Sequence, residues 1–311
     1  MPRRPGLVLV TGGAGFIGSH LVEALLARGD EVRVVDNLAT GRRANLAHLA
    51  GYEWFEGDLT SLDVCRAACD GVARVLHQAA VPSVPRSVED PLGSFATGPV
   101  ATMNLLEAAR QARVERVIFA ASSSAYGDTD ELPKREGMMP NPLSPYAAGK
   151  LAGEQFVRVY ARTMGLDGVS LRYFNVFGPR QDPSSPYSGV ISLFGTIMKR
   201  GDRPLIYGDG GQTRDFTYVA NVVQANLLAL DAPGPLGGDV FNVGTGEQVS
   251  LLDLVAAINA SLGTAIEPEF RPDRAGDVRH SLAALDRIGS ALGYRATVDF
   301  ATGLRLTLDA T

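Results

Sequence analysis

The chain has 311 residues, of which 45% are hydrophobic and 20% are charged, and its formal net charge is −5. This size suits one large α/β unit, or a domain with a smaller lobe. No basic block is present, which argues against a nucleic-acid partner. The apolar run near the N-terminus, residues 7–10, is too short for a signal peptide or a membrane span. We therefore expect a cytoplasmic protein with no membrane contact.

Cysteine and histidine usage gives no sign of a metal centre. Cys65 and Cys69 lie four apart without a companion pair, and the four histidines are scattered through the chain. We expect both cysteines to be reduced core residues, and we expect no metal ligands.

Short β-branched runs alternate with helical patterns in the first half of the chain. Strands are predicted at residues 7–11, 31–36, 53–56, 74–77, 117–121 and 169–173. Helices are predicted at residues 17–28, 99–112 and 145–164. Repeated βα units with apolar strands predict a parallel sheet that is covered on both faces.

The pattern loosens after residue 173. A Pro- and Ser-rich loop covers 179–189, strand-like runs at 204–207 and 239–243 flank a helix at 219–230, and another helix is predicted at 251–262. The expected fold is α/β, a Rossmann-type doubly wound parallel sheet with a smaller C-terminal α/β substrate lobe. Residues 1–175, with 216–246 returning to them, would form the dinucleotide domain, and 176–215 with 247–311 the lobe.

A glycine loop follows the first predicted strand. It reads Gly12-Gly13-Ala14-Gly15-Phe16-Ile17-Gly18, and a helical pattern comes next. Gly13, Gly15 and Gly18 fit the dinucleotide fingerprint, because glycine allows a tight turn, close approach of N–H groups to a pyrophosphate, and close helix–strand packing. The helix N-terminus then faces the phosphates, where its dipole favours negative charge.

An acidic residue ends the second predicted strand. Asp36 can accept hydrogen bonds from the adenosine ribose hydroxyls and would repel a 2′-phosphate, which favours NAD over NADP. Arg42 and Arg43 could favour NADP, but they lie beyond the strand end. Asp58 follows the third strand, where it would either lie near the adenine or act only as a turn residue.

Tyr146 and Lys150 lie four apart in Ser144-Pro145-Tyr146-Ala147-Ala148-Gly149-Lys150. Ser144 suits a helix N-cap and Pro145 the first helical position, so the pair would share one helix face. An ammonium beside the phenol favours its ionised form, and a tyrosine so tuned can act as a general base. Taken alone, the pair also fits an ordinary solvated helix face.

With the glycine loop, this pair makes the chain resemble the extended short-chain dehydrogenase/reductase family, and within it the nucleotide-sugar 4-epimerases of the UDP-glucose and UDP-N-acetylglucosamine kind. The resemblance covers nearly the whole chain. Its segments are 11–20, 36–38, 57–59, 77–80, 121–127, 144–150, 171–181, 210–219, 241–246 and 274–281. Each is short, but their order and spacing together are specific.

The resemblance implies NAD as the cofactor and a catalytic set of Ser122, Tyr146 and Lys150. Ser122 stands four residues before a Tyr-Gly pair, and its hydroxyl would hydrogen-bond the reacting sugar oxygen. The residues that the resemblance places at the cofactor are Gly12, Gly15, Phe16, Ile17, Gly18, Asp36, Asn37, Gly41, Asp58, Leu59, Gln78, Ala79, Ala80, Tyr146, Lys150 and Tyr173.

The resemblance also implies a UDP-sugar substrate and a homodimer formed through helices near 99–112 and 145–164. Arg214 and Arg274 would hold the diphosphate, because guanidinium forks suit that task. The residues that it places at the substrate are Ser123, Ser124, Asn175, Ser188, Gly189, Val190, Tyr207, Arg214, Arg274, Asp277 and Ser281.

Two positions depart from patterns seen in relatives. Many relatives have Thr-Asn-Val where this chain has Thr97-Gly98-Pro99, so an asparagine on the cofactor side is missing and the retention of NAD is in question. Some glucose-specific relatives carry a tyrosine where this chain has Ser281. The missing ring leaves room for an N-acetyl group on the sugar.

The expected function is reversible, NAD-dependent inversion of C4 of a UDP-hexose through a 4-keto intermediate. UDP-GlcNAc/UDP-GalNAc, and also UDP-Glc/UDP-Gal, would be the substrates. A 4,6-dehydratase would need an Asp-Glu pair where Ser123 and Ser124 stand. A UDP-uronate epimerase or decarboxylase stays open, and an inactive NAD-binding sensor is the alternative from another class. The complete Ser122, Tyr146 and Lys150 set argues against the sensor.

Overall fold

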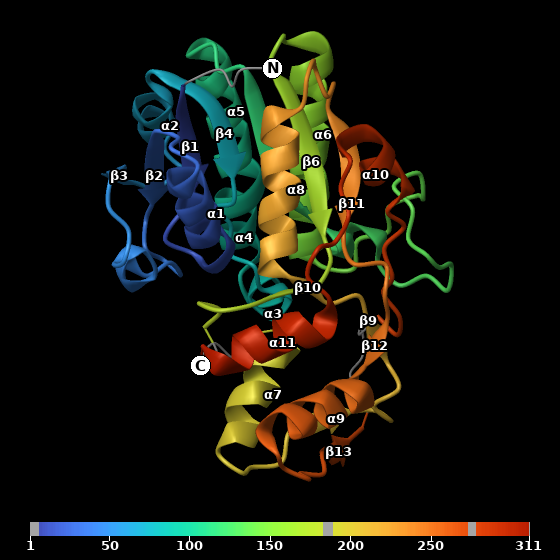
Figure 1. The fold of residues 1–311 in the computed structure, drawn as a ribbon. Coiled ribbons are helices and arrows are strands. Elements are labelled where there is room, and N and C mark those ends of the chain that lie inside the picture. The colour runs from blue at the N-terminus through green and yellow to red at the C-terminus, as the bar shows by residue number, and fades with distance from the viewer. Residues whose placement is uncertain (1–5, 183–188, 273–277, 311) are drawn as a thin grey trace.

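A seven-stranded parallel sheet forms the centre of the molecule (Figure 1). The computed structural model describes residues 6–182, 189–272 and 278–310. The strand order is β11-β6-β5-β4-β1-β2-β3. The strands are β1 (Leu7–Thr11), β2 (Val32–Asp36), β3 (Tyr52–Glu56), β4 (Val72–His77), β5 (Arg116–Ser122), β6 (Asp167–Tyr173) and β11 (Asp239–Val243). This arrangement confirms the predicted Rossmann-type sheet.

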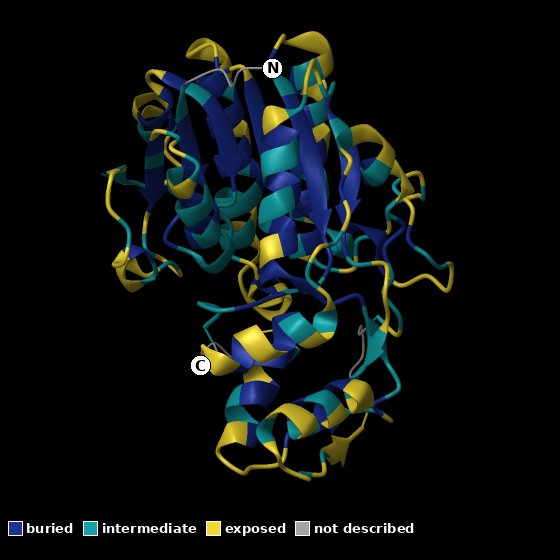
Figure 2. Cartoon of the chain, viewed as in Figure 1, coloured by how far each residue is buried: buried dark blue, intermediate teal, exposed yellow. Residues whose placement is uncertain are grey.

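Apolar side chains alternate along the strands and pack against helices on both sides. Val8 and Val10 of β1 join a core with α1 (Phe16–Ala27), α8 (Val219–Asp231) and α10 (Asp286–Leu292). Leu9, between them, joins the opposite core with α2 (Leu62–Cys69), α5 (Ala101–Gln111) and α6 (Pro145–Thr163). The strands are largely buried except for the edge strand β3, whose residues are half-buried or exposed (Figure 2). A parallel sheet is stable only when both of its faces are covered in this way.

The region between β4 and α5 is irregular. Two short helices, α3 (Val84–Glu89) and α4 (Pro91–Phe95), lead into a π-helical turn, η2 (Ala96–Val100). The helix predicted from residue 99 becomes a regular α-helix only at Ala101, because Pro99 has no N–H to donate within the turn. The sequence reading also missed helix α2, whose Cys65 and Cys69 are both buried and form no disulfide.

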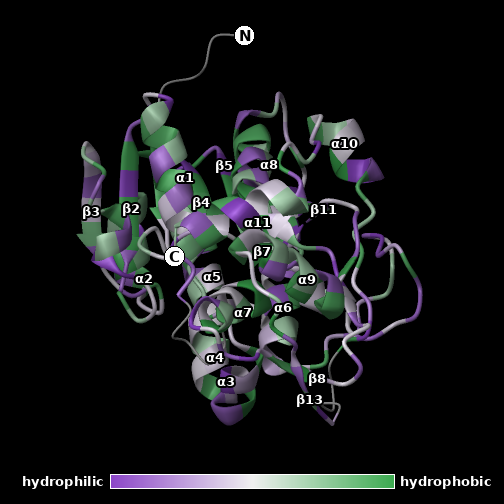
Figure 3. Ribbon diagram, turned by 60° about the horizontal axis from the view of Figure 1, so that its bottom comes forward, coloured by the Kyte–Doolittle hydropathy of each residue, from purple (hydrophilic) through white to green (hydrophobic). Residues whose placement is uncertain are grey.

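A second group of elements forms a separate apolar core beyond the carboxyl ends of the strands. Helices α7 (Val190–Lys199), α9 (Leu251–Leu262) and α11 (Phe300–Asp309) pack together there (Figure 3). The strands of this region are β7 (Val176–Phe177), β8 (Leu205–Tyr207), β9 (Thr213–Arg214), β10 (Thr217–Tyr218), β12 (Val249–Ser250) and β13 (Glu269–Arg271). They pair only in twos: β10 with β7, β12 with β9, and β13 with β8. We call this group the C-terminal lobe.

The sequence reading located α9 and β8 but not α7, α10 or α11. A search of the described ranges found no helix that is both long and apolar enough to cross a membrane.

Candidate functional site

A cleft of about 1470 Å³ opens between the carboxyl ends of the sheet strands and the C-terminal lobe. The last residues of β2, β5 and β6, which are Asp36, Ser122 and Tyr173, all lie on its wall. Open parallel sheets bind ligands at this edge, because the helix N-termini and the loops converge there.

The glycine loop forms one end of the cleft. Gly15 is the N-cap of α1 and has no side chain to cap the helix, so the first N–H groups of α1 face the cleft. A Cβ on Gly18 would lie 2.1 Å from the Gly12 carbonyl oxygen, so only glycine lets the helix approach the loop this closely. This cradle of backbone N–H groups suits a pyrophosphate.

The carboxylate of Asp36 lies beside the loop at the end of β2. It accepts hydrogen bonds from the backbone N–H of Ala14 at 2.9 Å and of Leu38 at 2.8 Å, and burial raises its pKa. Arg42 forms an ion pair with Asp182, and the guanidinium of Arg43 stacks 3.8 Å from the centroid of the Trp54 ring. Both arginines therefore have partners other than a 2′-phosphate, and the site fits NAD.

Asp58 lies on the other side of this end of the cleft. Its carboxylate accepts hydrogen bonds from the backbone and hydroxyl of Thr60 and from the Asn37 amide, and these bonds lower its pKa. The Thr60 contacts are those of a turn residue, and Asp58 also lies on the cleft wall, so its contact with the adenine stays a prediction.

Tyr146, Lys150 and Ser122 come together in the middle of the cleft. Ser144 caps α6 by accepting from the Ala147 N–H at 3.2 Å, so the helix begins one residue before Tyr146. The Tyr146 hydroxyl is hydrogen-bonded to Ser122. Lys150 Nζ lies 6.0 Å from the centroid of the Tyr146 ring and donates to the Ala120 carbonyl at 2.7 Å.

The pKa values of this pair reflect the burial of the site. Burial raises the pKa of Tyr146, while its hydrogen bond to Ser122 acts in the opposite direction. Burial lowers the pKa of Lys150 to about 8, and the charge of Glu154 opposes this shift. Because one tenth or less of Lys150 is exposed, its charge is poorly screened by water.

A buried, neutral histidine lies near Lys150. His77, at the end of β4, is hydrogen-bonded to Thr11 Oγ1 at 2.7 Å and to Thr102 Oγ1 at 3.1 Å. Burial, with a smaller effect from the Lys150 charge, lowers the pKa of His77 to about 3. His77 therefore adds no second positive charge beside Lys150 at neutral pH.

The three serines after β5 form a compact turn on the cleft wall. Ser122 Oγ accepts from the Ser124 N–H at 3.2 Å and from Ser124 Oγ at 2.8 Å, and it caps the short 3₁₀ helix η3 (Ser123–Tyr126). The turn thus presents hydroxyl groups, and no carboxylate, at positions 123 and 124.

All of the residues predicted for the cofactor lie on the wall of the cleft. Of those predicted for the substrate, the residues on the wall are Ser123, Ser124, Asn175, Gly189, Arg214 and Ser281. Val190 and Tyr207 lie in the C-terminal lobe away from the lining of the cleft. Ser188, Arg274 and Asp277 fall outside the described residues.

Two segments of the wall contain no individually predicted site residue. Residues 81–86, which run from the loop after β4 into α3, line the cleft, and so do Arg180 and Gln181. Both lie in stretches that carry the resemblance, 78–87 and 171–181, and the first follows the carboxyl end of a parallel strand, where such sheets bind ligands.

We call residues 179–182 the bridge segment. The Pro179 carbonyl accepts from His20 at 3.0 Å, Arg180 contacts His20 Nδ1 at 3.1 Å and pairs with Glu23, and Asp182 pairs with Arg42. The segment therefore joins helix α1 to the loop after β2, on either side of the glycine loop.

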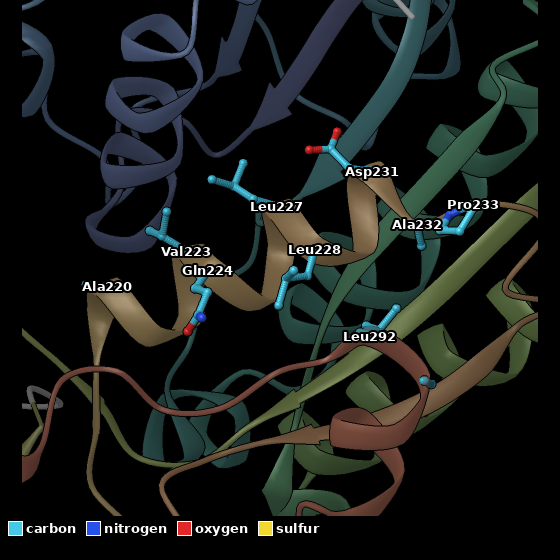
Figure 4. A pocket seen from close by; sticks show the side chains of 10 residues that line it. Ala220, Val223, Gln224, Leu227, Leu228, Asp231, Ala232, Pro233 and Leu292 are labelled. Carbon is cyan, nitrogen blue, oxygen red and sulfur yellow. The ribbon is translucent and has the colours of Figure 1, made fainter. Parts of the chain in front are cut away.

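A smaller cavity of about 500 Å³ lies between α8 and α10 (Figure 4). Its walls are mainly aliphatic, with Val223, Leu227, Leu228 and Leu292. Its one carboxylate, Asp231, forms ion pairs with Arg28 at 2.8 Å and Arg74 at 3.5 Å. Those ion pairs join the end of α8 to the end of α1 and to β4. No group of three or more His, Cys, Asp or Glu side chains in the described ranges could hold a metal ion.

Comparisons with known proteins agree with this geometry. The model of the NAD dependent epimerase/dehydratase family matches residues 8–244. A UDP-glucose 4-epimerase of Mycolicibacterium smegmatis is 40% identical over 306 residues, 97% of each chain. The structure of a UDP-N-acetylglucosamine 4-epimerase of Methanobrevibacter ruminantium, in complex with UDP-N-acetylmuramic acid, has a TM-score of 0.94 at 36% identity, covering 99% of this chain and 98% of the other. That of a Thermus thermophilus UDP-glucose 4-epimerase with NAD has a TM-score of 0.89 at 42% identity, covering 98% of both.

Proposed function

This chain belongs to the NAD dependent epimerase/dehydratase family and is an NAD-dependent epimerase, and from that premise we propose that it inverts C4 of UDP-GlcNAc and UDP-GalNAc, and also of UDP-Glc and UDP-Gal. Residues 1–175 with 216–246 would hold the cofactor, and 176–215 with 247–311 the UDP-sugar. The single observation that carries the proposal is that the Ser122–Tyr146 hydrogen bond and the buried Lys150 ammonium lie side by side in the cleft.

In this proposal Tyr146 takes the proton of the sugar 4-hydroxyl and returns it after inversion. Lys150, fixed on the Ala120 carbonyl, supplies the positive charge that favours the phenolate. Ser122 donates to the sugar oxygen through the hydroxyl that now bonds the Tyr146 phenol. A proton transfer of this kind requires the three groups to be positioned before the substrate arrives, and β5 and α6 provide that rigidity.

Bound NAD supplies the acceptor and donor of the hydride at C4. The glycine loop and Asp36 would hold its pyrophosphate and adenosine ribose, and Tyr173 would contact it from the end of β6. Backbone groups near Thr97 would replace the asparagine that relatives have at position 98. Thr97 lines the cleft and its own hydroxyl donates to the Gly93 carbonyl at 2.9 Å.

The sugar must turn over between the two hydride transfers while the diphosphate stays bound. Arg214, on the wall of the cleft, would provide the diphosphate contact, together with Arg274. Ser281 lines the same part of the cleft with a small side chain, which leaves space for an N-acetyl group. The turn at 122–124 offers no acid for elimination, so a 4,6-dehydratase is not supported.

We also propose a homodimer and a cytoplasmic location. Neighbouring helices α3, α4, α5 and α6 expose large apolar side chains, which are Val88, Leu92, Phe95, Met103 and Val159. An exposed apolar group of this extent favours burial in an interface. The two buried cysteines without a disulfide fit a reducing compartment. Sedimentation velocity should give a single species of twice the chain mass.

The function is tested by giving purified protein UDP-GlcNAc, UDP-GalNAc, UDP-Glc, UDP-Gal and UDP-GlcA, without and with added NAD, and resolving the products by NMR. We expect C4 inversion of the acetylated pair and of the plain pair. Inversion of UDP-GlcA alone, or loss of its carboxylate, would instead assign the uronate reaction. An absence of inversion on every sugar with NAD present would overturn the proposal.

A further inference from the structure

A buried ion pair lies beneath the catalytic group and takes no part in the mechanism above. Arg172 binds Glu154 through two bonds, Nε to Oε1 at 2.8 Å and Nη2 to Oε2 at 2.8 Å. Glu154 is 0% exposed and Arg172 is 3% exposed. Burying two charges carries a large desolvation cost, and apolar replacements are often equally stable, so stability alone is a poor explanation for the pair.

The pair connects the elements that carry Ser122, Tyr146 and Lys150. Glu154 lies one turn after Lys150 on the same face of α6. Arg172 is the neighbour of Ala121 in the pairing of β6 with β5, one position before Ser122. The Arg172 guanidinium also lies 4.5 Å from the centroid of the Tyr126 ring, at the end of η3.

Close packing at the same point leaves α6 little freedom. A Cβ on Gly153 would lie 2.4 Å from the Phe119 ring, so α6 approaches β5 more closely than any other residue at this position would allow. Lys150 Nζ lies 5.1 Å from the centroid of that ring. The Glu154–Arg172 pair thus lies where a small shift of α6 would move Lys150 away from the Ala120 carbonyl.

We propose that Glu154, held by Arg172, is a positioning residue for Lys150: it fixes the height of α6 over β5 and β6 and balances the buried ammonium charge that serves Tyr146. The inference rests on the proposed function for its catalytic meaning, and its central measurement does not require turnover.

Among the groups that face Lys150, Glu154 is the one whose charge raises the pKa of the lysine. His77 from β4 is neutral at pH 7, Tyr146 is the phenol it serves, and β5 contributes the Ala120 carbonyl and the Phe119 ring. Glu154 supplies a full negative charge, which raises the pKa of Lys150 against the effect of burial. If Glu154 became neutral, Lys150 would lose that support and would also face the unpaired charge of Arg172.

The sequence makes a direct measurement possible, because it contains only three lysines, at positions 134, 150 and 199. In an NMR spectrum, protein labelled with ¹³C-lysine and saturated with NAD would show three lysine side-chain signals. The signal that is missing in Lys150→Met is that of Lys150. We expect Glu154→Gln to lower the titration midpoint of Lys150 by roughly one pH unit or more. The alkaline limb of the kcat profile should move to lower pH by a similar amount.

A matched control exists at the opposite end of the same two strands. Arg116 of β5 donates to Asp167 of β6 at 2.7 Å, and both are largely buried. Asp167→Asn should reduce stability but leave the Lys150 midpoint and the pH profile unchanged. An equal shift in both variants, or no shift in Glu154→Gln, would overturn the inference.

If Glu154→Gln fails to fold, a double variant keeps the test decisive. Glu154→Leu with Arg172→Met removes both charges, and apolar replacement of a buried pair usually preserves folding. We expect its Lys150 midpoint to lie below that of the wild type. A wild-type midpoint in this folded variant would overturn the inference. If the wild-type protein turned over no UDP-sugar but the variants still showed these shifts, the proposed function would be wrong and the charge coupling between Glu154 and Lys150 would remain.

Discussion

The two sides of the cleft are built in different ways. On the sheet side, Ser122 and Tyr173 end long, buried strands and Tyr146 lies on a helix of 19 residues. On the lobe side, Arg214 belongs to a strand of two residues, and Ser281 lies in a segment without regular structure (Figure 1). Rigid elements hold reacting groups in place, while short strands and loops can adapt to a substrate that must turn. The contrast predicts that changes on the sheet side alter kcat, and changes on the lobe side alter KM or the choice of substrate.

The largest effect is expected on the sheet side, from Tyr146→Phe. Removing the general base should lower kcat about 10²- to 10⁴-fold while NAD and UDP-sugar still bind, as measured by calorimetry. Tyr160→Phe is the control, since Tyr160 lies on the same helix and its hydroxyl contacts Glu107 at 3.3 Å, away from the cleft. If Tyr146→Phe turned over at the wild-type rate, the sheet side would not carry the chemistry.

Arg214→Ala tests the lobe side. Because hydrogen bonds to a charged diphosphate are stronger than neutral ones, we expect KM for the UDP-sugar to rise about 10- to 100-fold while kcat changes little. Arg203→Ala is the control, since Arg203 lies on the lobe, donates to the backbone carbonyls of Glu267 and Pro268, and is not part of the described cleft wall. A fall in kcat with an unchanged KM would contradict the division between the two sides.

Ser281→Tyr sharpens the same contrast by changing only the space for the sugar. The Ser281 backbone is fixed by its N–H bond to the Thr213 carbonyl at 3.1 Å, so a larger side chain must extend into the cleft. We expect kcat/KM for UDP-GlcNAc to fall about 10- to 100-fold relative to UDP-Glc. Ser281→Ala should leave the ratio unchanged. If Ser281→Tyr left the ratio of the two kcat/KM values unchanged, a residue other than Ser281 would determine the choice of sugar.

The last effect concerns the stability of the sheet side and its dependence on pH. The pKa of His77 is about 3 in the folded state against 6.5 for the unperturbed side chain, so between these values only the unfolded chain binds its proton. Stability should therefore fall as the pH drops from 6.5 towards 3, by at most about 1.4 kcal/mol per pH unit from this group. Urea unfolding at a series of pH values should show a shallower dependence in His77→Gln. An identical slope would show that another group controls acid unfolding.

The same contrast explains how far the sequence could be read. The β strands of the sheet and helices α1, α6, α8 and α9 follow from apolar periodicity, because each buries one face against a large core. Gly15, Asp36, Ser122 and Tyr146 were predictable because strand ends and helix starts determine where they lie. The short strands of the lobe carry too few residues to show a period.

Other features depend on tertiary contacts that no local pattern records. The π-helical turn at Ala96–Val100 could be suspected only from Pro99. The partnership of Glu154 with Arg172 joins residues 18 apart in the chain, and its meaning appears only when β5 and β6 are side by side. The contacts of Arg180 with His20 and Glu23 join residues about 160 apart in the chain, and no sequence motif indicates them.

The bridge segment at residues 179–182 bears on how often a bound coenzyme is exchanged. It spans from α1 to the loop after β2 and lines the cleft, so we expect its contacts to slow the release of a dinucleotide bound on the glycine loop. A dehydrogenase built in this way would be slowed at every cycle, because it must exchange its spent coenzyme. An epimerase returns the hydride to the molecule that gave it and ends each cycle with the coenzyme restored. For such an enzyme a slow exit carries no penalty, and its activity becomes independent of the cellular ratio of oxidised to reduced NAD.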